Sequence, residues 1–221
     1  DQSLAAAAKA HNVPYGLSTV SGMPIEEAGA RAADVLWFQL YRFPNEDHKL
    51  GKDLIRRADE AGAKVLVLTL DTPIRTTRTR EVLAGITNPF RFTPKMILEA
   101  LSCPAYCVNF LRYGIPRLAN FQRYFPGMSL NDSLVAAQKE MRGTFSWDDV
   151  AMYRQLWKKP LVLKGILNPA DAERALAIGV DGLWVSNHGG RQIEALPAPI
   201  DILPSIVATA RGRAKVFYDS G

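Results

Sequence analysis

The chain has 221 residues, 48% of them hydrophobic and 22% charged, so it can bury one sizeable core. Its net charge of +5 would suit a nucleic acid, an anionic membrane surface or an anionic small molecule. No nucleic-acid-binding motif accompanies that charge, and three histidines with two cysteines form no zinc pattern, so we expect neither a nucleic acid nor a metal. A run of about 18 apolar residues, as a membrane-spanning helix requires, does not occur.

Apolar runs of strand length alternate with helical patterns along the first 70 residues. The patterns predict helices at 3–11, 24–33 and 47–61, and strands at 13–17, 35–40 and 64–70. Pro24 occupies a favoured early helix position, and Gly62 is typical of a residue that ends a helix. The nearly continuous apolar run 64–70 indicates a strand that is covered on both faces.

This alternation stops between Arg75 and about Lys159, where no strand of comparable quality occurs. It resumes with predicted strands at 160–163, 180–185 and 214–218 and predicted helices at 169–178 and 199–210. Strands that alternate with helices favour a parallel sheet with helical crossovers.

Reactive side chains follow the apolar runs at their C-terminal ends: Ser18, Gln39, Tyr41, Thr69, Asp71, Lys164, His188, Arg191 and Asp219. A (β/α)8 barrel builds its active site in this way, from the C-terminal ends of several strands. A doubly wound sheet binds ligands at one switch point instead, and no Gly-x-Gly-x-x-Gly follows the first strand. We therefore predict an α/β protein with a (β/α)8 TIM barrel, incomplete because only six strands are found.

The stretch Ser186-Asn187-His188-Gly189-Gly190-Arg191-Gln192 places an imidazole and a guanidinium three residues apart on a glycine-permitted turn. An arginine can hold a carboxylate through two parallel hydrogen bonds, and a nearby histidine can take a proton. The motif therefore indicates a site for a small anionic substrate.

With Lys164-Gly165-Ile166 and Asp219-Ser220-Gly221, this stretch closely resembles the FMN-dependent α-hydroxy acid oxidase and dehydrogenase family. That family includes glycolate oxidase, lactate oxidase and the L-lactate and mandelate dehydrogenases. The resemblance implies that the six strands match strands 2 to 7 of the family barrel. We accordingly interpret 1–221 as a single FMN-binding domain truncated at both ends, with 75–147 inserted after the third strand present. Such a chain is not expected to fold alone as a monomeric enzyme.

The resemblance also implies FMN as the cofactor and an L-2-hydroxy acid, lactate- or mandelate-like, oxidised to the 2-keto acid. His188 would be the base, paired with Asp71; Arg191 and Arg78 would hold the carboxylate, and Tyr41 the hydroxyl or keto oxygen. Arg75 and Arg80 compete with Arg78 for that role, and the proton could come from carbon or oxygen. The cofactor would be bound by Ser18, Gln39, Thr69, Lys164, Ser186, Asp219 and Gly221.

The segment 75–147 is rich in basic and aromatic residues, a composition typical of contact with an anionic membrane. A lid over the site or an oligomer contact are the alternatives. Cys103 and Cys107 are expected to be two reduced, buried thiols, because they lie four residues apart.

For the whole protein we expect a homo-oligomer in the cytoplasm, or peripheral at the inner face of the cytoplasmic membrane. A quinone, oxygen or a cytochrome would reoxidise the flavin. The alternative functions are a catalytically inactive barrel fragment that acts as a binding module, and another flavin-dependent TIM-barrel enzyme.

Overall fold

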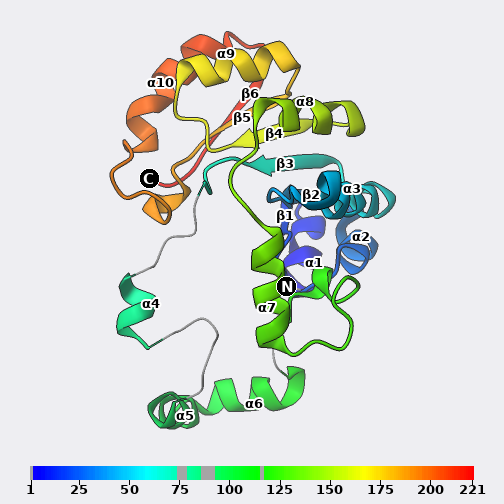
Figure 1. Ribbon diagram of the computed structural model, residues 1–221, viewed down its shortest axis with the longest axis vertical. Helices are drawn as coiled ribbons and strands as arrows, with labels where there is room; N and C mark the ends of the chain where they lie inside the picture. Colours follow the sequence, from blue (N-terminus) through cyan, green and yellow to red (C-terminus); the bar gives the residue numbers. More distant parts are fainter. Residues whose placement is uncertain (1, 74–78, 86–92, 115–116) are drawn as a thin grey trace.

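The computed structural model describes residues 2–73, 79–85, 93–114 and 117–221. Its centre is one parallel sheet of six strands in the order β1-β2-β3-β4-β5-β6 (Figure 1). The strands are β1 (Tyr15–Ser18), β2 (Leu36–Leu40), β3 (Val65–Thr69), β4 (Leu161–Lys164), β5 (Gly182–Val185) and β6 (Lys215–Tyr218). A doubly wound sheet would reverse its strand order, and this sheet does not.

One helix precedes the first strand, and further helices connect the successive strands. They are α1 (Gln2–Ala10), α2 (Ile25–Ala32), α3 (Asn45–Glu60), α8 (Trp147–Leu156), α9 (Pro169–Ile178) and α10 (Pro199–Ala210). Local signals explain several of their ends: the Ser146 and Asp149 side chains form a capping box at the start of α8, and Gly179 ends α9 in the left-handed conformation. The predicted bounds of the last two helices are confirmed, and the other predicted helices and strands differ from the observed ones by one or two residues at their ends.

The two faces of the sheet pack differently because strand side chains alternate. Leu36, Phe38 and Leu40 of β2 are fully buried in the large core formed with the helices. The opposite face carries a smaller cluster of Val65, Val67 and Val162, packed against Trp37, Trp184 and Phe217. All five residues of β3 are buried, which confirms that this strand is covered on both faces. The second cluster occupies the side that becomes the interior of a barrel.

The sheet is not closed. Among the described residues, β1 pairs only with β2, and β6 pairs only with β5. A parallel sheet with consecutive neighbours and helical crossovers is part of a (β/α)8 barrel, as predicted.

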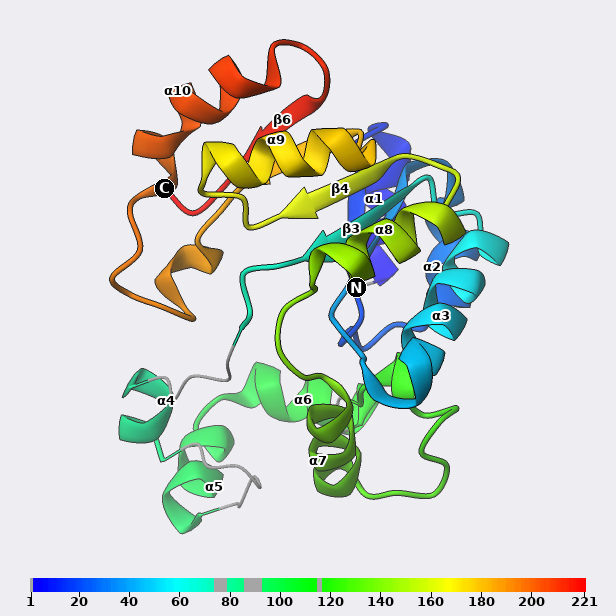
Figure 2. The same ribbon diagram turned by 45° about the horizontal axis from the view of Figure 1, so that its top comes forward.

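The segment between β3 and β4 contains α4 (Thr79–Leu83), α5 (Pro94–Leu101), α6 (Pro104–Tyr113) and α7 (Leu130–Glu140). Figures 1 and 2 show α4, α5 and α6 lying away from the sheet. The end of α7 is joined to the start of α3 by a hydrogen bond from Asn45 to Glu140. Cys103 begins α6 and is exposed, and Cys107 is half-buried. The predicted free thiols are confirmed, but their predicted burial is wrong because α6 contributes no residue to the core.

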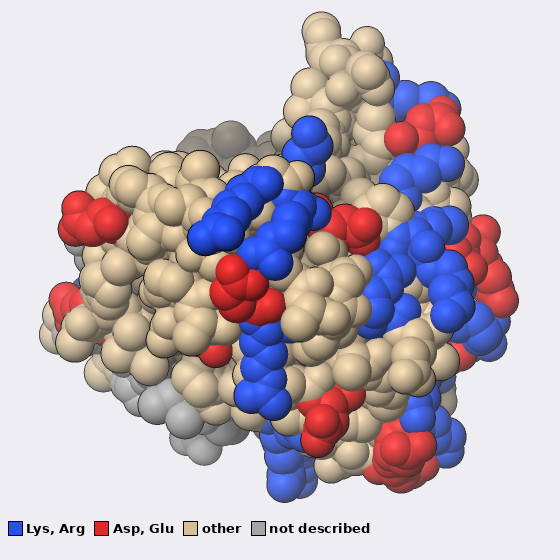
Figure 3. All heavy atoms as spheres, turned by 90° about the horizontal axis from the view of Figure 1, so that it is seen from above, with Lys and Arg blue, Asp and Glu red and all other residues tan. Residues whose placement is uncertain are grey.

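Within the part of the chain that the structure describes, no helix is both long and apolar enough to span a bilayer. On the face seen in Figure 3, basic and acidic side chains are interspersed. Among the described residues, several basic and acidic side chains pair with each other, as Arg154 does with Asp181 (2.8 Å) and Arg213 with Glu173 (2.7 Å). The positive charge of the chain is therefore not gathered into one continuous stripe on that face.

A buried network anchors the part of the insertion around Asn120. Asn120 donates to the Thr19 carbonyl at 3.2 Å and accepts from Ile25 N at 2.9 Å, and its own carbonyl accepts from Arg57 at 3.2 Å. Arg57 is 4% exposed and forms two hydrogen bonds with Glu26. These contacts fix the short helix Ala119–Phe121 beside the loop after β1, so they place Leu118 at the edge of the site described next.

Candidate active site

His188 and Asp71 form the centre of the site. His188 Nδ1 lies 2.8 Å from Asp71 Oδ1, and the Asp71 side chain is 3% exposed. In the turn that follows β5, both His188 (φ 59°) and Gly189 (φ 65°) adopt the left-handed conformation. Glycine adopts this conformation without steric cost, whereas a histidine rarely does. Gly165 lets Asp71 approach, because a Cβ at that position would lie 2.6 Å from Asp71 Cβ. The predicted pair is thus brought together across 117 residues of sequence.

Lys164 places a cation beside this pair. Its Nζ lies 3.3 Å from Asp71 Oδ2 and 3.4 Å from Asp219 Oδ2, and it donates to Ser186 Oγ at 2.6 Å. Burial disfavours the ionised form of Asp219, but hydrogen bonds from Ser186 and Ser220 and the charge of Lys164 outweigh it, so the pKa of Asp219 is below its usual range. The site therefore contains one lysine between two carboxylates.

Two serines hold the backbone of the His188 turn. Ser186 Oγ accepts from the amide of His188 at 3.1 Å, and Ser220 Oγ accepts from the amide of Gly189 at 2.8 Å. Ser220 in turn donates to Asp219 Oδ1 at 2.8 Å. No role was predicted for Ser220, although it lies in the Asp219-Ser220-Gly221 motif, because its contact forms only where the ends of two strands come together.

Neutral side chains form a row along the ends of β1, β2 and β3. Ser18 donates to Gln39 Oε1 at 2.8 Å, and Gln39 Nε2 donates to Thr69 Oγ1 at 2.7 Å. Thr69 pairs in register with Lys164 on the next strand, so the row ends at the cation. Hydroxyls and an amide beside a fixed positive charge match the edge of a ring system that carries amide-like groups and becomes anionic on reduction.

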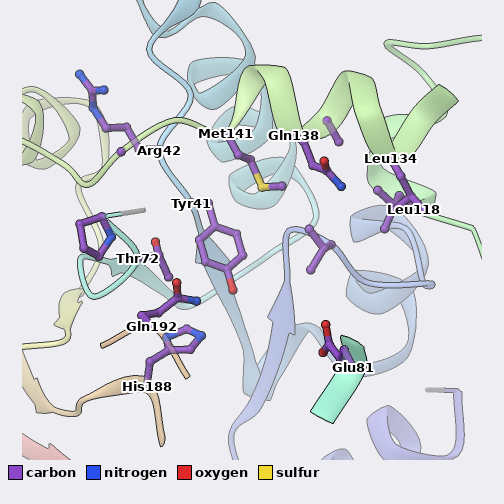
Figure 4. Close-up of a pocket in the computed structure, with 14 residues that line it drawn as sticks. Tyr41, Arg42, Thr72, Glu81, Leu118, Leu134, Gln138, Met141, His188 and Gln192 are labelled. Atoms are coloured by element: carbon purple, nitrogen blue, oxygen red, sulfur yellow. The ribbon is translucent and has the colours of Figure 1, made fainter. Parts of the chain in front are cut away.

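A pocket of about 450 Å³ opens at the same edge (Figure 4). Tyr41, Thr72, His188 and Gln192 contribute polar groups to its lining. Its apolar lining comes from Val20, Leu118, Leu134, Ala137 and Met141, and it is completed by Arg42, Pro73, Glu81, Gln138 and Gly143. The insertion thus supplies much of the wall, including three residues of α7. A lid over the site was one of the predicted alternatives for this segment, but the residues of α7 were not singled out.

The structure gives less support to the two arginines that were predicted to hold the carboxylate. Arg191 Nη2 lies 3.8 Å from Glu81 Oε1 of α4, and the Arg191 side chain is 52% exposed. Its neighbour Gln192 lines the pocket, whereas Arg191 does not. Arg78 lies outside the described residues. Gly221 follows Ser220 with φ 76°, at the same edge as Asp219.

Comparisons with known proteins show which enzymes the chain resembles. The chain is 36% identical to an L-lactate dehydrogenase of Pseudomonas syringae over 220 residues, which cover 99% of this chain and 57% of the relative. It is 34% identical to an (S)-mandelate dehydrogenase of Pseudomonas putida, covering all of this chain and 55% of the relative. The chain thus spans little more than half the length of these curated relatives.

Solved structures give the same result. The crystal structure of the monotopic membrane protein (S)-mandelate dehydrogenase superimposes with a TM-score of 0.92 at 34% identity, over all of this chain and 58% of that one. A mandelate oxidase superimposes with a TM-score of 0.74 at 31% identity, over 99% of this chain and 53% of that one. A sequence model of the FMN-dependent dehydrogenases matches residues 1–221 in full. The incomplete barrel with His188 and Asp71 at its strand ends therefore belongs to the FMN-dependent dehydrogenase family.

Proposed function

We propose that the whole protein oxidises an L-2-hydroxy acid to the 2-keto acid with FMN as its cofactor. The observation that carries this proposal is the part-buried His188–Asp71 pair, because His188 also lines the pocket. Relatives named as L-lactate and (S)-mandelate dehydrogenases support it. In this proposal residues 1–221 are one barrel domain, and 75–147 are an insertion in it.

The residues at the strand ends fit FMN. Ser18, Gln39 and Thr69 would bind the edge of the ring, since they offer both donors and acceptors. Lys164 would stabilise negative charge on that edge, and Ser186, Asp219 and Gly221 would complete the binding set. When bound, FMN accepts the two electrons that leave the substrate.

His188 acts as the base in this scheme. Asp71 engages Nδ1, so Nε2 is the nitrogen that can take a proton from the α-carbon or the hydroxyl of the substrate. The Asp71 carboxylate also stabilises the imidazolium that forms. Tyr41 hydrogen-bonds the substrate hydroxyl or keto oxygen, while Arg191 and Arg78 hold the carboxylate.

The pocket indicates how the side chain of the substrate is accommodated. Five apolar residues form part of its lining, and lactate and mandelate both carry an apolar substituent on the α-carbon. A quinone, oxygen or a cytochrome then takes the electrons from the reduced enzyme.

The insertion supports peripheral membrane association at the inner face of the cytoplasmic membrane. Leu98 (69% exposed), Leu111 (85%) and Tyr113 (72%) leave apolar surface on α5 and α6, which lie away from the sheet. A monotopic membrane protein is among the similar structures. Apolar helices with basic neighbours suit an anionic interface, although a lid or a homo-oligomer contact would use the same surface.

One experiment distinguishes the proposed enzyme from the alternative, a catalytically inactive binding module. The purified protein should carry FMN in stoichiometric amount, and substitution of Lys164 by Met should weaken that binding and make flavin reduction harder. A colourless protein that does not bind added FMN would exclude the proposed function. Bound flavin that no 2-hydroxy acid reduces would favour another flavin-dependent barrel enzyme.

A further inference from the structure

Two loops meet at the outer side of the pocket. The first follows Tyr41 and leads into α3, and the second connects α7 to α8. The backbone amide of Arg142 donates to the Arg42 carbonyl at 3.3 Å, and Arg42 Nη1 donates to the Arg142 carbonyl at 3.2 Å. Asn45 Nδ2 donates to Glu140 at 3.0 Å. The loops are therefore joined at several points, although about 100 residues separate them.

Asp149 lies at the centre of this junction. Its Oδ2 accepts from Arg42 Nε at 2.7 Å and from the amide of Ser146 at 2.8 Å, and its Oδ1 lies 3.0 Å from His48 Nε2. The Asp149 and His48 side chains are each 11% exposed. Burial opposes ionisation of Asp149, but the hydrogen bonds from Arg42 and Ser146 and the adjacent charges keep its pKa below the usual range. A buried carboxylate thus bridges both loops.

The approach of His48 to Asp149 requires an unfavourable backbone. Glu46, Asp47 and His48 have φ of 47°, 53° and 59°, a left-handed run that non-glycine residues rarely adopt. The His48 ring packs edge-on against Tyr153 at 5.9 Å. Such a backbone persists only where surrounding contacts determine it. His48 contacts Asp149 and Tyr153, while the exposed Glu46 and Asp47 side chains pair with Lys49 and Lys52.

Both loops contribute to the pocket. Tyr41 directly precedes Arg42, and Met141 and Gly143 directly flank Arg142; all three line the cavity. Figure 4 shows the Arg42 guanidinium pointing away from the cavity, so its charge is directed to Asp149 and not to a substrate. Arg42 thus lines the cavity with part of its side chain, while its guanidinium is engaged by Asp149.

We propose that Arg42, Asp149 and His48 form a latch that holds Tyr41 and the end of α7 in place around the pocket. Arg42 is a positioning residue in this scheme and does not bind the substrate. The effect on substrate binding rests on the proposed function, whereas the effect on the loops does not.

The test uses the purified holoprotein and three variants. Arg42→Gln removes the charge, and Arg42→Lys keeps the charge but loses the planar set of N–H donors. Arg56→Gln is the matched control, because Arg56 forms exposed ion pairs on α3. Backbone amide exchange is measured over 41–45 and 140–146, and the KM and kcat for L-lactate or (S)-mandelate are measured in parallel.

In Arg42→Gln we expect amide exchange in both loops to be about 10-fold faster, with β3 and β4 unchanged, because a charged hydrogen bond is lost locally. The KM should rise by about 10-fold and more than kcat falls, with partial recovery in Arg42→Lys and none of these effects in Arg56→Gln. Unchanged amide exchange in Arg42→Gln would overturn the latch, whether or not the KM rises. Equal acceleration throughout the sheet would also overturn it, since Arg42 would then be a general stability contact. Faster loop exchange in a protein that oxidises no 2-hydroxy acid would leave the latch standing and refute the proposed function.

Discussion

His188 Nδ1 and Asp71 Oδ1 are 2.8 Å apart, and the other oxygen of the same carboxylate lies 3.3 Å from Lys164 Nζ. Asp71 therefore links the proposed base to the cation of the proposed flavin site. Because its side chain is 3% exposed, water cannot easily replace either contact. A change at Asp71 should consequently affect both groups, whereas a change at His188 should affect proton transfer alone.

The first prediction concerns the base. His188→Gln should slow flavin reduction by about 10²–10⁴-fold, the usual effect of losing general base catalysis, while FMN remains bound. Asp71→Asn should slow the same step less, because the imidazole stays in place. Stopped-flow reduction under anaerobic conditions measures both variants. A near-normal rate in His188→Gln would remove His188 from the mechanism.

Much of the fold could be predicted from the sequence because the strands are short apolar runs that end in polar residues. The observed ends of a strand differ from the predicted ones where a polar residue pairs with a residue of the next strand. Ser18 extends β1 beyond the predicted 13–17 because it pairs with Gln39 in register and bonds its side chain. Local patterns do not contain that information.

Some residues of the site were predicted, but most of the contacts between them were not, for the same reason. The pairing of His188 with Asp71 came from the resemblance to a family, since their separation in sequence carries no signal of contact. The contacts of Ser220, Asn120 and Asp149 form between distant loops, and no pattern of apolar residues anticipates them. Burial was predicted wrongly for Cys103, because spacing cannot show that α6 contributes nothing to the core.

The second prediction concerns carboxylate binding. Arg191→Lys keeps the charge but loses the planar pair of donors, so both the affinity for the hydroxy acid and the rate should fall clearly. Steady-state kinetics with L-lactate and (S)-mandelate measure the change in KM and kcat. Arg213→Lys is the control, since Arg213 pairs with the exposed Glu173. If Arg191→Lys behaves as wild type, Arg191 does not hold the carboxylate.

The third prediction concerns acid stability. The pKa of Asp149 is lowered in the folded protein, so its ionised form stabilises the fold above the unfolded pKa of about 3.9. That contribution is lost as pH falls from about 4 through the folded pKa. The free energy of unfolding in urea, measured from pH 7 to 3, should therefore fall less steeply below about pH 4 in Asp149→Asn than in the wild type. Parallel curves would show that Asp149 is not stabilised as an anion.

The fourth prediction concerns the membrane. Replacing Leu98 and Leu111 together by Ser should reduce co-sedimentation with anionic vesicles, because apolar area on α5 and α6 is lost. Vesicle binding by the wild type should also weaken as salt rises. Leu156→Ser on α8 is the control, since Leu156 is an exposed leucine (49%) outside the insertion. Equal binding by all three proteins would leave a lid or an oligomer contact as the role of the insertion.

The most direct test of the account is the reduction of bound flavin by a 2-hydroxy acid in the absence of oxygen. The holoprotein is mixed anaerobically with L-lactate or (S)-mandelate, and the flavin absorbance band is followed, with dithionite as the control for full reduction. We predict that at least one of the two acids bleaches the band in the wild type and that His188→Gln is not bleached on the same timescale. Flavin that dithionite reduces but neither acid reduces would contradict the proposed function.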